Sequence, residues 1–162
     1  MKTLWRIASD TPDYVAHDLS GKGAEITGGR WNRTGLPVVY AAASAALAAL
    51  ESIVHFAAAG LPLNRFLVRI DLPDDLWELR RCATAASLEV GWNAVPAGKV
   101  SLDFGDAWLK DPAASLVLEV PSVIVPEESN ILLNARHPHM SRVKATKLRL
   151  WQYDGRLIPR SP

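Results

Sequence analysis

The stretch GGRWNRTGLPVVYAAASAALAALESIVHF, residues 28–56, joins a glycine pair and an arginine to a strand and a helix. The β-branched run PVVYAA (37–42) predicts the strand. Ser44 is the expected N-cap of the alanine-rich helix, and Gly60 with Pro62 predicts its end at about residue 59. The stretch thus predicts one strand followed directly by one helix.

Glu51 lies on the apolar face of this predicted helix. At about 100° per residue, it shares an arc about 100° wide with four apolar residues, Leu47, Leu50, Val54 and Ala58. A carboxylate among apolar neighbours is costly unless a cation or several hydrogen-bond donors meet it. We therefore expect Glu51 either to hold a structural ion pair, with Arg30 or His55, or to act chemically in a cleft.

The composition fits a single globular domain over residues 1–162. Hydrophobic residues make up 49% of the 162 and charged residues 22%, which is enough for a real core. The formal net charge is +1 and no run of Lys and Arg reaches five residues, so direct nucleic-acid binding is disfavoured. Cys82 is the single cysteine, which excludes an internal disulfide.

No apolar run approaches the roughly 18 residues of a membrane span. The first residues, MKTLWRIASDTPDY, have no apolar core of signal-peptide length. We expect a cytoplasmic protein that does not contact a membrane.

Further segments have the alternating or β-branched pattern of strands: 4–8, 65–73, 115–126 (two strands bent at Pro121), 130–134 and 147–158. In 65–73 the alternation predicts one clearly buried face. Residues 21–29 are expected to form a glycine-containing loop, and 101–111 is the best helix candidate in the tryptophan-containing middle of the chain. Strands mixed with scattered short helices predict an α+β domain with mixed small sheets.

Arg30 and Tyr40 are candidate functional residues beside Glu51. Arg30 follows two glycines, where the backbone can approach a ligand closely and a planar guanidinium suits phosphate or carboxylate. On this local evidence alone a surface arginine after a turn is favoured, because the chain contains no phosphate-loop signature. Tyr40 shares a strand face with Val38 and is expected to face the core, with a hydroxyl group that needs a partner.

Other polar motifs favour structural roles. Ser122 follows a proline at a strand bend without a GxSxG motif, so a hydrogen-bonding serine is favoured over a nucleophile. His137 and His139 have no nearby cysteine or carboxylate cluster, so we expect loop structure and no metal. Most of the six tryptophans are expected in the core, because no basic cluster surrounds them.

Together, the blocks LWRI, GGRWNRTGLPVVYAAASAALAALESIVH, LEVPSVIVPEESNILLNARHP and WQYDGRL resemble the RES domain, the toxin component of RES-Xre toxin-antitoxin modules. The resemblance extends from about residue 4 to 158. Its specificity comes from the order and spacing of GGRWN, GxPVVY and AxxES within thirty residues. The arginine, glutamate and serine that name the family correspond to Arg30, Glu51 and Ser122.

The resemblance implies a fold similar to ADP-ribosyltransferase toxins and an enzyme that uses NAD+ as its substrate. It implies a toxin that degrades NAD+ at the nicotinamide–ribose bond, by hydrolysis or phosphorolysis, with ADP-ribosylation of a cellular protein as the alternative. The implied partner is an Xre-like helix-turn-helix antitoxin, and a homodimer within that complex is left open. A partner-binding domain without enzymatic activity is a second alternative.

The chemistry of NAD+ gives each candidate residue an expected role. Nicotinamide departs neutral, so the difficulty is the oxocarbenium-like charge on the ribose, which a carboxylate such as Glu51 stabilises. Tyr40 would stack at the nicotinamide ribose end, and Arg30 would hold the pyrophosphate or that ribose. Ser122 would orient Glu51 or a ribose hydroxyl. Two further residues are secondary candidates for cofactor contact, Arg6 and Asn32.

Overall fold

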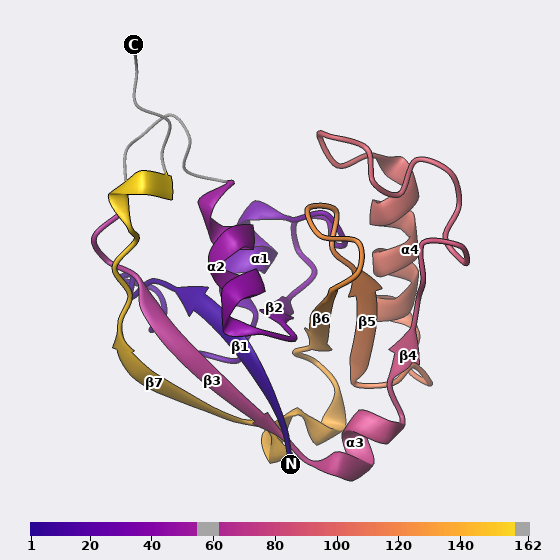
Figure 1. Cartoon of the computed structure of the whole chain (residues 1–162). Helices are drawn as coiled ribbons and strands as arrows, with labels where there is room; N and C mark the ends of the chain where they lie inside the picture. The colour runs from indigo at the N-terminus through magenta and orange to yellow at the C-terminus, as the bar shows by residue number, and fades with distance from the viewer. Residues whose placement is uncertain (55–61, 158–162) are drawn as a thin grey trace.

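The computed structural model describes residues 1–54 and 62–157. Within these ranges, seven strands form one sheet in the order β4-β5-β6-β2-β1-β3-β7 (Figure 1). The strands are β1 (Lys2–Ala8), β2 (Val38–Ala42), β3 (Phe66–Leu72), β4 (Arg81–Cys82), β5 (Val117–Pro121), β6 (Ser129–Asn134) and β7 (Lys144–Leu150). Neighbouring strands are antiparallel except for β4 and β5, which are parallel.

The helices of the described residues are short. They are α1 (Lys22–Thr27), α2 (Ala45–Ile53), α3 (Asp74–Glu78), α4 (Lys99–Lys110) and the 3-10 helices η1 (Pro138–Arg142) and η2 (Gly155–Leu157). Ser44 caps α2 as expected, because its side chain accepts a hydrogen bond from the backbone N–H of Leu47. None of these helices combines the length and the apolar composition that crossing a membrane requires.

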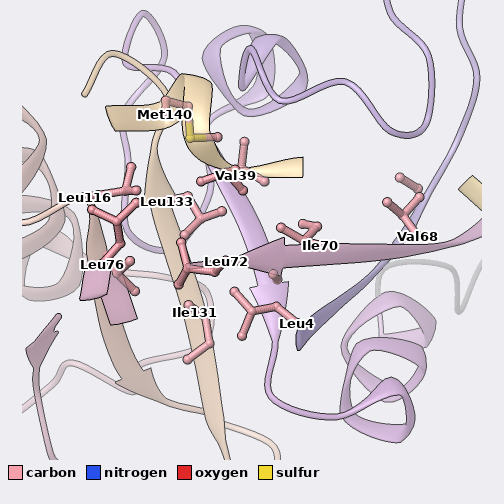
Figure 2. Packing of buried hydrophobic residues seen from close by; sticks show 14 of the residues in the cluster. Leu4, Val39, Val68, Ile70, Leu72, Leu76, Leu116, Ile131, Leu133 and Met140 are labelled. Carbon is pink, nitrogen blue, oxygen red and sulfur yellow. The ribbon is translucent and has the colours of Figure 1, made fainter. Parts of the chain in front are cut away.

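One face of the sheet carries the larger hydrophobic core (Figure 2). The alternation predicted for 65–73 is confirmed in β3, where Val68, Ile70 and Leu72 are fully buried. Short elements cover this face, with Leu76 of α3 and Met140 of η1 packed onto the strands. The core on this face stabilises the fold, and helices α2 and α4 pack on the opposite face.

Both longer helices, α2 and α4, cover the opposite face. Trp108 of α4 is buried beside Leu132 of β6, and Leu47 of α2 packs with Ala42 of β2 and Ile7 of β1. Because α2 lies over β1 and β2 while α4 lies over β5, the two helices stand apart on the sheet (Figure 1). The candidate site lies between α2 and residues 95–97, which precede α4.

The sheet separates between β1 and β2. These strands share one paired position, Trp5 with Ala42, whereas β1 pairs with β3 along its whole length and β2 pairs with β6 along its whole length. Beyond that single pair, residues of both strands line a cavity instead of bonding to each other. The separation opens the sheet at the level of Tyr40.

The α+β expectation is confirmed, and the strands expected in small sheets join one continuous sheet. Three local expectations differ from the structure. The second strand expected after Pro121 is absent from the described residues, because residues 122–128 form the turn between β5 and β6. Residues 21–29 contain helix α1, and the last strand spans 144–150 instead of 147–158. Helix α2 ends at Ile53, and its expected end at about residue 59 lies outside the described residues.

Candidate active site

A cavity of about 970 Å³ opens where β1 and β2 separate. Its wall includes β1, β2, the start of β6, the C-terminal turn of α2 and the loop at residues 95–97. Polar and charged side chains in its lining include Arg6, Arg30, Tyr40, Glu51 and Asn130. Segments far apart in the sequence thus supply one shared wall.

Glu51 lies in the last turn of α2 and faces this cavity. Its Oε1 atom accepts hydrogen bonds from the Ser122 hydroxyl at 2.7 Å and from the Asn130 amide nitrogen at 2.5 Å. Among the described residues, no cation lies within ion-pair distance of Glu51. The expected ion pair with Arg30 is therefore not formed, and His55 lies outside the described residues.

The residues that share the helix face of Glu51 are buried only in the first half of the helix. Leu47 is 2% exposed and belongs to the core, whereas Val54 is 51% exposed and lines the cavity. A carboxylate in the last turn of a helix also meets the negative end of the helix dipole, which disfavours its charge by roughly 0.3–1 kcal/mol. Two neutral donors, rather than a salt bridge, offset this cost.

The turn between β5 and β6 provides both donors. Ser122 follows β5 directly, is fully buried, and accepts hydrogen bonds from the backbone N–H groups of Ile124 and Val125. Asn130 is the second residue of β6 and pairs with Val120 of β5. Ser122 is thus held by its own turn, and Asn130 is held by the sheet.

Arg30 reaches the cavity from the turn after α1. Its Nη1 atom donates to the carbonyl oxygens of Trp92 at 3.1 Å and Ala94 at 2.8 Å. Burial lowers the pKa of Arg30, and the negative charge of Glu51 opposes this effect. Arg30 therefore lies in the electrostatic field of Glu51 while its hydrogen bonds go to neutral acceptors.

The turn that carries Arg30 is fixed against α4. The backbone N–H of Arg33 donates to Asp106 at 3.0 Å, and its guanidinium forms an ion pair with the same buried carboxylate at 2.5 Å. Trp31 is buried, with its ring stacked 6.3 Å from that of Trp92 and edge-on to Phe104 at 5.9 Å. These contacts hold the backbone that follows Arg30.

Arg6 of β1 contributes a second guanidinium to the cavity wall. Its Nη1 atom donates to the backbone carbonyl of Asp18 at 3.1 Å. Burial lowers the pKa of Arg6, and the Asp18 carboxylate opposes this effect. Within the described residues, neither Arg6 nor Arg30 forms an ion pair, so both positive charges remain available to an anionic ligand.

Tyr40 is tied into the wall by its hydroxyl group. The hydroxyl donates to Asn32 Oδ1 at 2.7 Å and accepts from the backbone N–H of Trp31 at 3.1 Å. Gly29 lies against this pair: a Cβ atom there would lie 2.7 Å from the Tyr40 oxygen, so a larger residue would displace the tyrosine. The glycine before Arg30 is thus required by the close approach of Tyr40.

We expect the Tyr40 phenol to stay protonated until the protein unfolds in alkali. Burial raises the pKa of Tyr40 well above the ordinary value of 10.0. Unfolded chains therefore lose this proton at lower pH than folded ones, and the stability it contributes is present below about pH 10 and declines above it. Ultraviolet difference titration of phenolate absorbance, with Tyr40→Phe as reference, should show this tyrosine ionising together with unfolding. Ionisation of Tyr40 in the folded protein near pH 10 would contradict the burial of its hydroxyl.

The structure brings together four of the six residues predicted from the sequence for the site. Arg6, Arg30, Tyr40 and Glu51 line the cavity, whereas Ser122 and Asn32 do not. Asn32 is fully buried, and its amide nitrogen contacts the carbonyl oxygens of Ala24, Arg33 and Leu36. Neither residue lines the cavity, so neither is placed to contact a ligand there. Ser122 donates a hydrogen bond to Glu51, and Asn32 accepts one from Tyr40 and donates to carbonyl oxygens of the turn after α1.

Sequence reasoning missed Asn130, which lines the cavity and contacts Glu51. In the segment NILLN it appears as the polar first residue of a buried strand, a common position for a turn amide. Asn130 and Leu132 are two residues apart on β6, so their side chains lie on the same face of the strand. Leu132 pairs with Tyr40, so this is the face of the sheet that carries Tyr40. The two-residue spacing was the signal available in the sequence.

The segment with His137 and His139, expected to be a loop, contains the 3-10 helix η1, with His137 at its N-cap. His137 accepts a hydrogen bond from the backbone N–H of His139 at the start of η1. Over residues 1–54 and 62–157, no group of three or more histidine, cysteine, aspartate or glutamate residues could hold a metal ion. Trp31, Trp92 and Trp108 are buried as expected, whereas Trp5, Trp77 and Trp151 are only partly buried.

The comparison with protein families decides where this chain belongs. The family model described as the RES domain matches residues 3–154, nearly the whole chain. The chain belongs to the RES domain family. The resemblance that the sequence blocks indicate is thereby confirmed.

Relatives of this RES-domain chain align with it over most of their length. Prs ADP-ribosylating toxin of Sphingobium sp. (strain YBL2) is 54% identical over 156 residues, which cover 96% of each chain. Toxin Res of Pseudomonas putida is 40% identical over 143 residues, covering 87% of this chain and 90% of its own. Toxin Res of Photorhabdus laumondii is 35% identical over 149 residues, covering 90% and 91%.

Proposed function

We propose that this RES-domain protein is a toxin that breaks the nicotinamide–ribose bond of NAD+. One observation carries the proposal: a carboxylate held by neutral donors shares a cavity with two arginines whose hydrogen bonds go to backbone carbonyls. An anionic pyrophosphate suits the arginines, and a cationic sugar suits the carboxylate. The names of the relatives, all toxins and one of them ADP-ribosylating, support it.

The proposed reaction uses the charge of the leaving group. The electron pair of the bond between ribose C1′ and the nicotinamide nitrogen moves to the ring, which departs neutral. Positive charge is left on C1′ and the ribose oxygen, and a nucleophile then forms the new bond at C1′ and loses its proton. No acid has to protonate the leaving group, so stabilising the cationic sugar is the main task of the protein.

Each cavity residue has a proposed role in this reaction. Glu51 stabilises the developing positive charge and holds a ribose hydroxyl. Arg30 binds the pyrophosphate or the ribose next to nicotinamide, and Arg6 is a second contact for the phosphates. Tyr40 provides a rigid aromatic surface at the nicotinamide ribose end, because its hydroxyl is already used by the wall.

The acceptor of ADP-ribose distinguishes two versions of this function. The relative with 54% identity is named an ADP-ribosylating toxin, which favours transfer to a protein over the degradation that the sequence alone places first. Degradation is kept as the second version, because Val54, Val95 and Ile124 at the cavity are exposed and leave it open to water or phosphate. Both versions require the same bond to break.

An Xre-like helix-turn-helix antitoxin is the proposed partner. A cell that carries an NAD+-consuming enzyme needs it held inactive, and covering the cavity would achieve this directly. Val54, Val95 and Ile124 give the cavity mouth an apolar rim that a protein could cover. The proposal places the antitoxin over this rim.

We expect the purified protein to release nicotinamide from NAD+, and its expression alone to arrest growth as the NAD+ pool falls. Chromatography of the products distinguishes free ADP-ribose, from hydrolysis of NAD+, and ADP-ribose phosphate, from phosphorolysis of NAD+, from ADP-ribose bound to protein. Co-expression of an Xre-like helix-turn-helix antitoxin should restore growth. An unchanged NAD+ pool without any ADP-ribosylated protein would reject the function and favour a partner-binding domain.

A further inference from the structure

We infer that Asn130 is a positioning residue that, together with Ser122, binds one oxygen of Glu51 and leaves the other for the reacting ribose. The inference rests on the proposed function, since it assigns a task to each oxygen of the proposed catalytic carboxylate. It adds a residue outside the arginine, glutamate and serine that name the family.

Both hydrogen bonds to Glu51 end on the same atom. Ser122 and Asn130 donate to Oε1, at 2.7 and 2.5 Å, and no hydrogen bond to Oε2 occurs among the described residues. A carboxylate oxygen has two lone-pair sites, so two donors occupy Oε1 fully. The remaining oxygen keeps its accepting capacity in a cavity that Glu51 lines.

The sheet fixes the position of the Asn130 amide. Its backbone pairs with Ala42 of β2 on one side and with Val120 of β5 on the other. The turn between β5 and β6 also contacts the start of α2, because the Ser44 hydroxyl donates a hydrogen bond to the Glu128 carboxylate at 2.9 Å. Strand β6 and helix α2 are thus joined at both ends of the helix, and the distance between Asn130 and Glu51 is set by rigid elements.

A neutral donor suits this position better than a cation. Arg30 lies within the electrostatic field of Glu51 across the same cavity, and a Glu51 side chain released from its donors could rotate toward it. An ion pair between them would neutralise both charges that the proposed reaction needs. The amide of Asn130 holds the carboxylate in place while leaving its negative charge intact.

The test compares two substitutions at one position. Asn130→Ala removes the donor, and Asn130→Asp replaces it with a second carboxylate against Oε1. We expect Asn130→Ala to lower kcat for NAD+ cleavage about 10-fold, with KM changed less than about 3-fold. Asn130→Asp should be several-fold worse than Asn130→Ala at about pH 8, and should recover relative to wild type as the pH falls toward about 5.

The recovery has a direct physical reason. Two carboxylates in contact favour binding of one proton between them, and the protonated aspartic acid then donates an O–H to Oε1 as the asparagine does. Asn134→Asp is the matched control, because Asn134 lies on the same strand and face but contacts Leu109 and Arg136 and does not line the cavity. Its turnover per folded molecule should equal that of wild type at every pH.

The outcomes separate this inference from the proposed function. If wild type cleaves NAD+ while both Asn130 variants cleave it at the wild-type rate per folded molecule, the positioning role is overturned and the function stands. Equal losses in both variants that follow their melting temperatures, without recovery in acid, would also overturn it. If wild type binds but does not cleave NAD+, the proposed function fails and the inference fails with it.

Discussion

Glu51→Gln is expected to lower NAD+ turnover by at least about 10²-fold, or roughly 2.7 kcal/mol of barrier. Glutamine keeps the size of the side chain and an acceptor oxygen for Ser122 and Asn130, so the local geometry survives. Only the negative charge that stabilises the cationic sugar is lost. The affinity for NAD+, measured by calorimetry, should change little, while nicotinamide release falls.

Stability distinguishes catalysis from a structural role for Glu51. Breaking a buried ion pair would destabilise the fold by roughly 3–5 kcal/mol. The structure shows neutral donors and a position in the last helical turn, so we expect an unchanged or higher melting temperature for Glu51→Gln. The exposed Glu127 provides a control, since Glu127→Gln should leave both turnover and melting temperature as in wild type. A Glu51→Gln protein that melts several degrees lower yet keeps near-normal turnover would make Glu51 structural.

Among substitutions of the described glycines by alanine, we expect Gly105→Ala to lower the free energy of unfolding most. A Cβ atom at Gly105 of α4 would lie 1.8 Å from the backbone oxygen of Trp31. Overpacking a core usually costs about 1–3 kcal/mol, and this contact should exceed that range because no side-chain rotation relieves a clash with backbone. Helix α4 must move away from the turn that carries Arg30, so NAD+ turnover should fall as well.

Thermal unfolding followed by circular dichroism measures this effect. Gly155→Ala is the control, because nothing lies within 4 Å of a Cβ atom at Gly155. That variant should melt within about 2 °C of wild type, as is usual for a surface substitution in a chain of this size. A Gly105→Ala protein with wild-type stability would mean that α4 and the Trp31 backbone are not in close contact.

Local patterns predicted the elements that depend on neighbours in sequence. Ser44 and the N–H of Leu47 are three residues apart, so the start of α2 could be predicted from the sequence. The alternation in β3 predicted its buried face, because successive side chains of a strand point to opposite sides. The strand expected after Pro121 was wrong, because Ser122 bonds to the next backbone N–H groups and closes a turn.

Helical periodicity predicted only half of the environment of Glu51. The arc shared with Leu47 indicates which way the side chain faces, but it does not distinguish a core from a cavity. Val54 lies on the same arc and is 51% exposed. Whether a helix face meets packed side chains or open space depends on the strands beneath it, and here β1 and β2 separate at that level.

The sequence by itself determined that a strand such as β3 has one buried face and that Ser44 caps the start of α2. It also placed Arg30, Tyr40 and Glu51 in one stretch of a RES-like pattern. The family resemblance already offered Ser122, 71 residues away, as a residue that could orient Glu51, whereas tertiary structure alone decided that Asn130, 79 residues away, meets the same carboxylate oxygen. It also decided that Arg6 joins the cavity and that Asn32 does not. The physical reason is that propensity and periodicity act over a few residues, whereas the order of strands in the sheet sets which distant side chains share a wall.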